Sequence, residues 1–149
     1  MPIAENKKAY HNYKISDTLE AGLVLSGPEV KSVKKGQINL KGSYISLDGR
    51  GEAWLVNAYV APYKPAKTVQ KNYNPHQARK LLLKKKELSF LTGKQKEKGT
   101  TLIPLKVYLK NRLIKLEIGI AHGKKKYDKR EEIKKRDFTK RKRRLLTSD

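Results

Sequence analysis

The most regular segment of the chain is TLIPLKVYLKNRLIKLEIGIA, residues 101–121. Apolar and polar residues alternate on both sides of its central Lys110-Asn111-Arg112, and such alternation is typical of strands with one buried face. The polar residues between the two halves predict a turn. We therefore expect a β-hairpin in which residues 101–109 and 113–121 pair antiparallel.

Further strands are expected upstream of this hairpin. Residues 13–25 are rich in Leu, Val and Ile and predict a strand, whereas 38–47 and 53–60 alternate around the turn Asp48-Gly49-Arg50-Gly51 and predict a second hairpin. The core candidates in these strands and in the first hairpin are Leu23, Val24, Leu40, Leu55, Val56, Leu105, Val107, Leu116 and Ile118.

Short helices are expected between the strands. Residues 27–36 begin with Gly-Pro, a start signal, and end on Gly36, a stop signal. Residues 75–91 carry leucines at helical spacing around a lysine run, which predicts two helices or one kinked helix. The first ordered stretch of the polar arm up to about His11 is expected to be extended, and residues 61–73, with two prolines, to be a loop. Antiparallel strands interleaved with short helices predict a closed Greek-key barrel of the oligonucleotide-binding type.

The charge of the chain is strongly positive. Its 149 residues carry a formal net charge of +22, and residues 1–123 alone hold 23 Lys and Arg against nine Asp and Glu. This charge favours a polyanion as partner, with nucleic acid ahead of an anionic membrane. The absence of cysteine excludes disulfides and thiolate zinc ligands. No signal core and no apolar run of about eighteen residues is found, so we expect a cytoplasmic protein with no membrane partner.

Residues 124–149 differ from the rest of the chain. Over 124–144 they carry thirteen Lys or Arg against four acids, with too few apolar side chains for a core. We therefore expect them to be disordered until they bind. Three acids each precede a base by four residues, and Asp128 can cap a helix. The expected organisation is a domain over 1–123 and a basic tail over 124–149 that becomes helical once phosphates neutralise it.

Patterns for catalysis or metal binding are missing. The three histidines lie far apart without a second ligand at metal spacing, so we expect no metal site and no cofactor. The serines lack a nucleophile-elbow context, and the glycines do not form a phosphate-binding loop. A basic ribonuclease that uses Glu20 or Glu29 with His122 stays as an alternative, although nothing in the spacing favours it. We expect no catalytic residues.

Seven blocks of the sequence occur in the order of a known family. They are EAGLVLSGPEVKSVKKG (20–36), GSY (42–44), GEAWL (51–55), APY (61–63), ARKLLLKKKEL (78–88), KGTTLIPLKVY (98–108) and GKKKYDKR (123–130). Together they resemble the SmpB family, the protein partners of transfer-messenger RNA in bacterial ribosome rescue. The resemblance implies a mainly β fold with short helices, a six-stranded antiparallel barrel related to the oligonucleotide-binding fold, and a basic tail that is disordered until bound.

The resemblance also implies partners and a mechanism. In the family the barrel binds the tRNA-like domain of transfer-messenger RNA, and the complex enters the A site of a ribosome stalled without a codon. The tail then lies in the empty mRNA channel beside the decoding centre, and translation resumes on the RNA's own frame. The protein would catalyse nothing, take no cofactor and act as a monomer when bound to RNA.

Several positions match the family's RNA-binding face, namely Asn6, Glu20, Lys31, Arg79, Lys80, Leu82 and Lys115. The lysines can contact phosphates, whereas Glu20 can accept hydrogen bonds from ribose hydroxyls or base amino groups. Leu82 fits either a contact with a splayed base or a place in the core. Gln77 stands where the family usually has the first arginine of an Asn-His-Asp-Pro-x-Arg-x-Arg run, so this chain lacks a phosphate contact expected there.

The tail residues that the resemblance implies begin at Gly123, a hinge between barrel and tail. Tyr127 stands where the family carries His or Tyr, so its ring is expected to stack on a base of the decoding centre. The ribosome-binding set is Gly123, Lys124, Lys125, Tyr127, Asp128, Lys129, Arg130, Lys134, Lys135 and Arg136.

A general RNA chaperone with a barrel of the cold-shock type is the second alternative. Such a protein depends on clustered surface aromatics that stack successive bases. The eight Tyr, two Phe and one Trp of this chain form no clustered motif. An RNA-binding protein of ribosome rescue is therefore the favoured interpretation, ahead of the chaperone and the ribonuclease.

Overall fold

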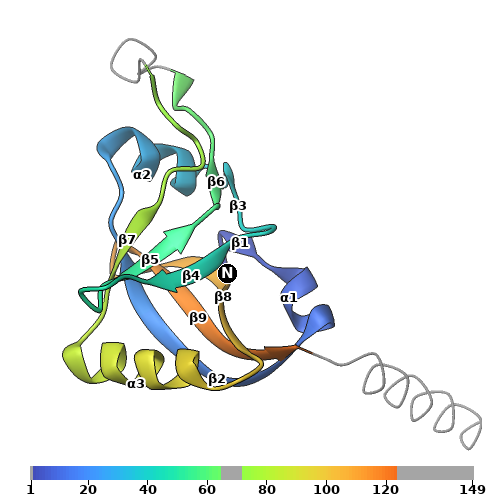
Figure 1. Cartoon of the computed structure of the whole chain (residues 1–149). Coiled ribbons are helices and arrows are strands. Elements are labelled where there is room, and N and C mark those ends of the chain that lie inside the picture. Colours follow the sequence, from blue (N-terminus) through green and yellow to red (C-terminus); the bar gives the residue numbers. More distant parts are fainter. Residues whose placement is uncertain (1, 65–71, 124–149) are drawn as a thin grey trace, which may run out of the picture.

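The structure is a computed structural model that describes residues 2–64 and 72–123. Figure 1 shows the long strands at the centre, with two helices, α2 and α3, at opposite ends of the molecule. The predictions for residues 124–149 lie outside the described residues. The elements in chain order are β1 (Ala4–Glu5), α1 (Lys7–Asn12), β2 (Tyr13–Leu23), α2 (Gly27–Lys34), β3 (Ile38–Asn39), β4 (Tyr44–Leu47), β5 (Ala53–Val56), β6 (Tyr59–Val60), β7 (Arg79–Leu82), α3 (Lys85–Lys96), β8 (Thr100–Lys110) and β9 (Leu113–Gly123).

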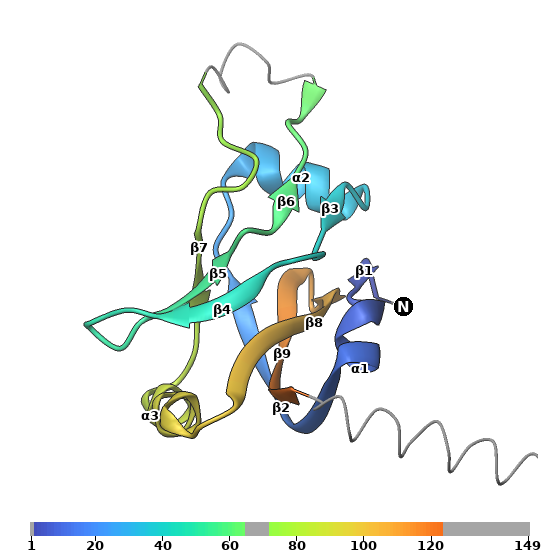
Figure 2. The same ribbon diagram turned by 45° about the vertical axis from the view of Figure 1, so that its right-hand side comes forward.

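Seven of the strands form one antiparallel sheet in the order β1-β8-β9-β2-β7-β5-β4, and β3 pairs with β6 in a separate ladder. The sheet curls so that its last strand, β4, lies against β8 (Figure 2). The expected mainly β, antiparallel, barrel-like fold with short helices is therefore confirmed. Two details are corrected: the main sheet has seven strands rather than six, and no ladder between described residues joins its edge strands β1 and β4. The barrel is open.

The main core fills the inside of the curled sheet. Val33 of α2 and Leu91 of α3 are fully buried against it, so each of these helices covers the core from its own end. Successive side chains of a strand point to opposite faces of the sheet, so every second residue points into the core. The residues between them face outward and are often polar. The long strands supply Ala21, Leu23, Val107, Leu116, Ile118 and Ile120 to this core.

A smaller apolar cluster lies under α1. A bulge interrupts the β8–β9 ladder between Pro104 and Lys106. Residues 102–105 of β8 are all buried because both faces of the strand are covered there: Leu102 packs into the main core, whereas Ile103 and Leu105 pack on the other face beside Ala9 of α1. The cluster consists of Ala9, Ile103, Leu105 and Ala121.

The hairpin expected over residues 101–121 is confirmed. β8 and β9 pair antiparallel up to Lys110 opposite Leu113. Asn111 and Arg112 form the turn with φ values of 51° and 66°, which are the left-handed values that the favoured two-residue hairpin turn requires. The strand and the helix expected further upstream are confirmed as β2 and α2.

The helices expected over residues 75–91 are wrong in their first half. Arg79–Leu82 is the strand β7, which pairs with β2 and β5. Its leucines follow the period of a strand, since Leu81 is 2% exposed and Leu82 is 57% exposed. The lysine run 84–86 lies where α3 begins and does not interrupt a helix.

The expectation that the first ordered stretch of the N-terminal arm is extended is confirmed, because that stretch is the short strand β1, which the helix α1 follows. Two smaller expectations are corrected. The hairpin expected over 38–60 is divided into two ladders, β4–β5 and β3–β6, because Gly42 and Asn57 take left-handed φ values of 75° and 65°. Among the core candidates, Val24 is 44% exposed and Val56 is only half-buried, whereas the others are buried.

The fit between Leu105 and Gly119 allows a test of this packing. A Cβ atom added at Gly119 would lie 2.8 Å from Leu105 Cδ1, and Leu105 is fully buried. We expect Gly119→Ala to lower the free energy of unfolding by about 1–3 kcal/mol through overpacking. Gly93→Ala on α3 is the control, because no atom lies within 4 Å of its added Cβ, and it should stabilise by about 0.5–1 kcal/mol. Urea denaturation measures both, and equal stability of the two variants would contradict the packing.

Candidate nucleic-acid interface

A row of residues crosses the outer face of the sheet. Tyr108 of β8 lies opposite Lys115 of β9, Lys115 lies opposite Gly22 of β2, and Gly22 lies opposite Leu82 of β7. Residues that are directly opposite in antiparallel strands project on the same face. In this row Gly22, which has no side chain, lies between the cation Lys115 and the exposed Leu82.

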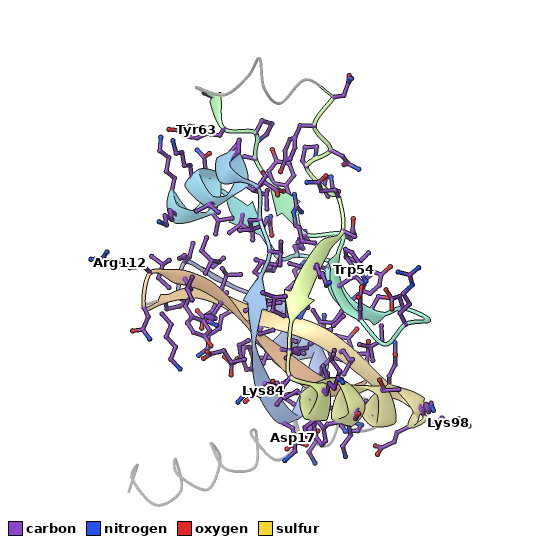
Figure 3. The ribbon with its side chains drawn as sticks, turned by 90° about the vertical axis from the view of Figure 1, so that its left-hand side faces the viewer. Asp17, Trp54, Tyr63, Lys84, Lys98 and Arg112 are labelled. Carbon is purple, nitrogen blue, oxygen red and sulfur yellow. The ribbon has the colours of Figure 1, made fainter. Side chains whose placement is uncertain are left out.

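Gly22 forms the floor of a groove. A Cβ atom at this position would lie 3.3 Å from Leu82 Cβ, which is tighter than ordinary contact. The start of α3 forms one side of the groove, and Figure 3 shows Lys84 there, at the end of the molecule opposite Tyr63. The residues that line the groove are Glu20, Gly22, Leu82, Leu83, Lys84, Glu87, Lys110 and Lys115.

The carboxylate of Glu20, on β2, forms hydrogen bonds in this groove with two side chains of β8. The Tyr108 hydroxyl donates to Glu20 Oε2 at 2.6 Å, and Lys110 Nζ lies 3.5 Å from Oε1 and 3.4 Å from Oε2. The Tyr108 hydrogen bond, followed by the hydrogen bond and charge of Lys110, holds the pKa of Glu20 below its ordinary value. The carboxylate is therefore ionised at neutral pH and acts only as an acceptor.

The structure brings three of the predicted RNA-binding residues into one groove, namely Glu20, Leu82 and Lys115. Lys80 lies nearby, two residues before Leu82 on the same face of β7, where it forms an ion pair with Glu52 at 3.5 Å. The exposed position of Leu82 excludes a place for it in the core. Whether these residues contact RNA stays a prediction, which the geometry makes concrete.

Two other predicted residues lie outside the groove. Lys31 is exposed on α2, where its Nζ lies 5.4 Å from the ring centroid of Tyr63, and Lys35 lies over the same ring at 5.1 Å. Asn6 precedes α1, and its side-chain amide donates to Pro104 O at 3.0 Å. A single flat surface therefore does not hold the whole predicted set.

Arg79 is buried, which removes it from the exposed face that the sequence predicted. Its guanidinium forms an ion pair with Glu29 at 2.7 Å, and the two side chains are 2% and 3% exposed. Arg79 also donates to the carbonyl oxygens of Ala58 and Pro75 and to the Tyr73 hydroxyl. Every nitrogen of this side chain is used inside the protein, so its role here is structural.

Glu29 stands at the centre of this buried network. Its Oε1 accepts from the Ser26 N–H and completes a capping box at the start of α2, while its Oε2 accepts from Arg79 and from Gln77 Nε2 at 3.1 Å. Burial raises the pKa of Glu29, but the hydrogen bonds from Ser26 and Arg79 and the charge of Arg79 outweigh it, and the pKa is lowered. Gln77, which replaces an expected arginine, thus has an internal partner.

Tyr73 is the fourth member of the network. Its hydroxyl lies 3.0 Å from both Glu29 Oε2 and Val60 O, so its one proton is shared between these two acceptors. Burial and the neighbouring Glu29 raise the pKa of Tyr73 to about 12. The hydroxyl therefore stays a donor at neutral pH, and the network joins α2 to the segment that leads into β7.

The sequence interpretation missed most of the other residues at the groove, among them Gly22, Lys84 and Lys110 of its lining and the neighbouring Tyr108. The hairpin turn fixes the register of β8 on β9, so the sequence contained a signal for Tyr108 beside Lys115. No local signal exists for Gly22 or Lys84, because β7 was interpreted as a helix and its place beside β2 was unknown.

Over residues 2–64 and 72–123, no three side chains of the His, Cys, Asp and Glu types come together as a metal site. No helix in the same ranges is long and apolar enough to cross a membrane. Gly123 is the last residue of β9 and is exposed. The other nine predicted ribosome-binding residues lie outside the described part of the chain and stay predictions.

A basic antiparallel β-barrel with an open groove in which lysines surround the Glu20 carboxylate is typical of the nucleic-acid-binding class of protein. The family model described as "SmpB protein" matches residues 3–148. The chain is 55% identical over 136 residues to the "SsrA-binding protein" of Persephonella marina, covering 91% of this chain and 88% of that protein. It is 50% identical over 135 residues to the "SsrA-binding protein" of Geobacillus kaustophilus, with coverage of 91% and 85%. The chain belongs to the SmpB family.

A solved structure agrees with this assignment. A chain of the complex "tmRNA-SmpB: a journey to the center of the bacterial ribosome" superposes with a TM-score of 0.70 and 43% sequence identity. The match covers 89% of this chain and 95% of that one. The fold and the family are therefore supported independently.

The buried ion pair of Glu29 and Arg79 predicts a loss of stability in acid. Because the pKa of Glu29 is lowered in the folded protein, its contribution is complete above its ordinary value of 4.5 and is lost as the pH falls through the folded value. Glu29→Gln should lower the free energy of unfolding by about 3 kcal/mol at pH 7, since it leaves Arg79 buried without a counter-charge. The difference from wild type should shrink at acidic pH.

Urea denaturation between pH 7 and pH 3 measures this difference. Glu97→Gln is the control, because Glu97 is 52% exposed in its pair with Lys94, and it should change stability by less than about 0.5 kcal/mol. A Glu29→Gln deficit that is small or independent of pH would contradict the assigned role of the pair.

Proposed function

We propose that the protein binds the tRNA-like domain of transfer-messenger RNA and carries it to ribosomes stalled without a codon. The observation that carries this proposal is the groove around Gly22. It combines Lys84, Lys110 and Lys115, which suit phosphates, with Glu20, which suits a hydroxyl or amino donor of RNA. Membership of the SmpB family and the likeness to a chain of the tmRNA-SmpB complex support the same partner and the ribosome.

The groove suits a folded RNA better than an unstructured strand. A general RNA chaperone stacks successive bases on clustered aromatics, whereas none of the described residues that line this groove is aromatic, and the nearby Tyr108 is hydrogen-bonded to Glu20. Leu82 offers a single apolar contact next to several cations. This composition favours a partner recognised by its shape and backbone, with few base contacts.

Two functional parts are proposed for the chain. Residues 1–123 form the RNA-binding barrel, and residues 124–149 form a basic tail that enters the empty mRNA channel beside the decoding centre. The sequence supports this division, since thirteen Lys or Arg over 124–144 need rRNA phosphates to offset their repulsion. Three acid–base pairs at a spacing of four residues and Asp128 as a cap suit a helix in the bound state.

We also propose that the protein acts in the cytoplasm, as a binding partner and not as an enzyme. Peptide tagging would then depend on the RNA and the ribosome, and this protein would supply placement. The ribonuclease alternative needs Glu20 or Glu29 near His122. Glu29 is committed to Ser26, Arg79 and Gln77, and His122 lies 3.3 Å from the Thr100 hydroxyl.

Binding of the barrel to the tRNA-like domain should depend on salt. If about five phosphates are neutralised, log affinity should fall with log salt at a slope of about −3 to −5. Lys115→Ala should weaken binding by about 1 kcal/mol and flatten the slope by nearly one unit. Glu20→Ala should weaken binding with little change in slope, because it removes a hydrogen-bond acceptor and not a cation.

Fluorescence titration at several salt concentrations measures both quantities. Lys14→Ala is the control for Lys115→Ala, since it removes the same charge from β2 at the opposite end of the β2–β9 ladder. If Lys14→Ala and Lys115→Ala weaken binding equally, the affinity comes from total charge and not from the groove.

Truncation after Gly123 should separate the two functional parts. The barrel keeps every strand, so folding and binding of the tRNA-like domain should largely survive, whereas peptide tagging on stalled ribosomes should be lost. Tyr127→Ala should lose part of the tagging through a missing stacking contact of about 1–3 kcal/mol. The measurement is tagging on ribosomes stalled in a purified translation system, with RNA binding measured in parallel.

A permuted tail is the matched control for this truncation. It keeps the composition and charge of residues 124–149 but breaks the four-residue spacing of acids and bases. It should fail to support tagging as the truncation does. Normal tagging by the truncated protein would refute the proposed role of the tail.

A further inference from the structure

Tyr108 and Glu20 meet across an intervening strand. Tyr108 lies on β8 and Glu20 on β2, and β9 runs between them. The register places Tyr108 opposite Lys115 and places Glu20 opposite Glu117, two residues further along β9. The 2.6 Å hydrogen bond from the Tyr108 hydroxyl to Glu20 Oε2 is therefore a diagonal contact that passes over β9 between Lys115 and Glu117.

This contact works against a local repulsion. Two carboxylates that are directly opposite in an antiparallel ladder repel each other, and Glu20 faces Glu117 in this way. Glu117 pairs with Lys106 at 3.2 Å on the other side of Tyr108. Lys106, Tyr108 and Glu117 line a separate hollow next to Pro2 and Leu109. The ring of Tyr108 thus divides that hollow from the groove and draws Glu20 to the groove side.

Because of this hydrogen bond, the two carboxylate oxygens of Glu20 have different partners. Oε2 receives the Tyr108 hydroxyl at 2.6 Å, whereas the hydrogen-bond contact of Oε1 within residues 2–64 and 72–123 is the longer 3.5 Å one with Lys110, whose side chain is 58% exposed. A carboxylate has about four lone-pair positions. Oε1 therefore keeps the capacity to accept a hydrogen bond from a molecule in the groove.

We propose that Tyr108 is a positioning residue for Glu20, and that it holds the carboxylate so that Oε1 accepts an O–H or N–H donor of the bound RNA. The inference rests on the proposed function, since it names the chemistry that the groove recognises. In the groove, Glu20 would recognise one hydrogen-bond donor of the RNA, either a ribose hydroxyl or a base amino or imino group. The lysines around it would contact phosphates. Position 22 must lack a side chain for that donor to approach.

The titration behaviour of the pair agrees with this arrangement. Burial, followed by the hydrogen bond to Glu20 and its charge, raises the pKa of Tyr108 far above its ordinary value. The same hydrogen bond lowers the pKa of Glu20. At neutral pH the tyrosine is therefore always the donor and Glu20 always the acceptor, which fixes the direction of the contact.

Tyr108→Phe in the full chain tests the proposal, because it removes one hydroxyl and leaves the ring. Affinity for the tRNA-like domain should fall by about tenfold, the size expected for the loss of one hydrogen bond to a charged group. The salt slope should not change, since no charge is lost. Tyr44→Phe is the control, because Tyr44 is 46% exposed on β4, and its affinity should equal that of wild type.

Two further readouts separate positioning from general stability. In a Glu20→Ala background, which has no acceptor for the Tyr108 hydroxyl, Tyr108→Phe should cause almost no additional loss of affinity, whereas a purely structural role would lower affinity by the same factor in both backgrounds. In the free protein, the pKa of the Glu20 carboxyl group should rise toward its ordinary value in Tyr108→Phe. NMR measures this pKa through the chemical shift of the carboxyl carbon. Additive losses, or an unchanged pKa of Glu20, would overturn the proposal.

The source of the donor is distinguished by single 2′-deoxy nucleotides placed along the tRNA-like domain. If a ribose hydroxyl is read, one deoxy position should weaken binding by wild type as much as Glu20→Ala does and should not weaken binding by Glu20→Ala further. If no position does so, the donor is a base. Failure of wild type to bind the tRNA-like domain at all would refute the proposed function, whereas binding that Glu20→Ala weakens and Tyr108→Phe does not would refute this inference alone.

Discussion

The register of β8, β9 and β2 is the constraint from which the core and the groove both follow. Along these strands every second residue faces inward, so Leu116 and Ile118 fill the barrel while Lys115 and Glu117 face outward. A slip of one residue would exchange the two sets and expose the leucines. The burial energy of the core therefore also fixes which side chains meet outside, including the contact between Tyr108 and Glu20. Recognition on this face does not need a separate scaffold, since the core residues hold it in place.

The buried pair of Glu29 and Arg79 organises the other end of the molecule. One carboxylate caps α2 through Ser26 and also balances the guanidinium from β7. This network connects the helix that carries Lys31 to the segment that enters the groove at Leu82. The lysines of the predicted RNA-binding set thus fall on two sites, the groove side and the α2 end, which are linked by buried polar contacts, whereas Asn6 lies apart from both, before α1. A folded RNA with two separated phosphate tracts suits such a surface better than a single extended strand.

The sequence predicts much of this fold because its periodicity is strong where one face is buried. The hairpin of β8 and β9, the long strand β2 and the capped helix α2 were all predicted correctly. The strand β7 was missed because three consecutive leucines beside lysines suit a helix equally well, and only its pairing with β2 and β5 decides the matter. Strand pairing, which the sequence alone does not give, also explains why part of the site was missed. Glu20, Leu82 and Lys115 came from the family resemblance, whereas Gly22, Lys84 and Tyr108 acquire their meaning from strand order. Arg79 was assigned to the surface because no local pattern reveals that a buried glutamate 50 residues away needs a cation.

The decisive measurement is photocrosslinking in the native cell from a reactive side chain placed at position 82 of the full chain, followed by sequencing of the attached RNA. Leu82 is 57% exposed beside Gly22, so a crosslinker there should attach to the tRNA-like domain of transfer-messenger RNA. A crosslinker at Gln95, an exposed position near the far end of α3, should attach much less of this RNA. Equal crosslinking at the two positions, or attachment at position 82 to many unrelated RNAs, would contradict the assignment of the groove as the RNA-binding site.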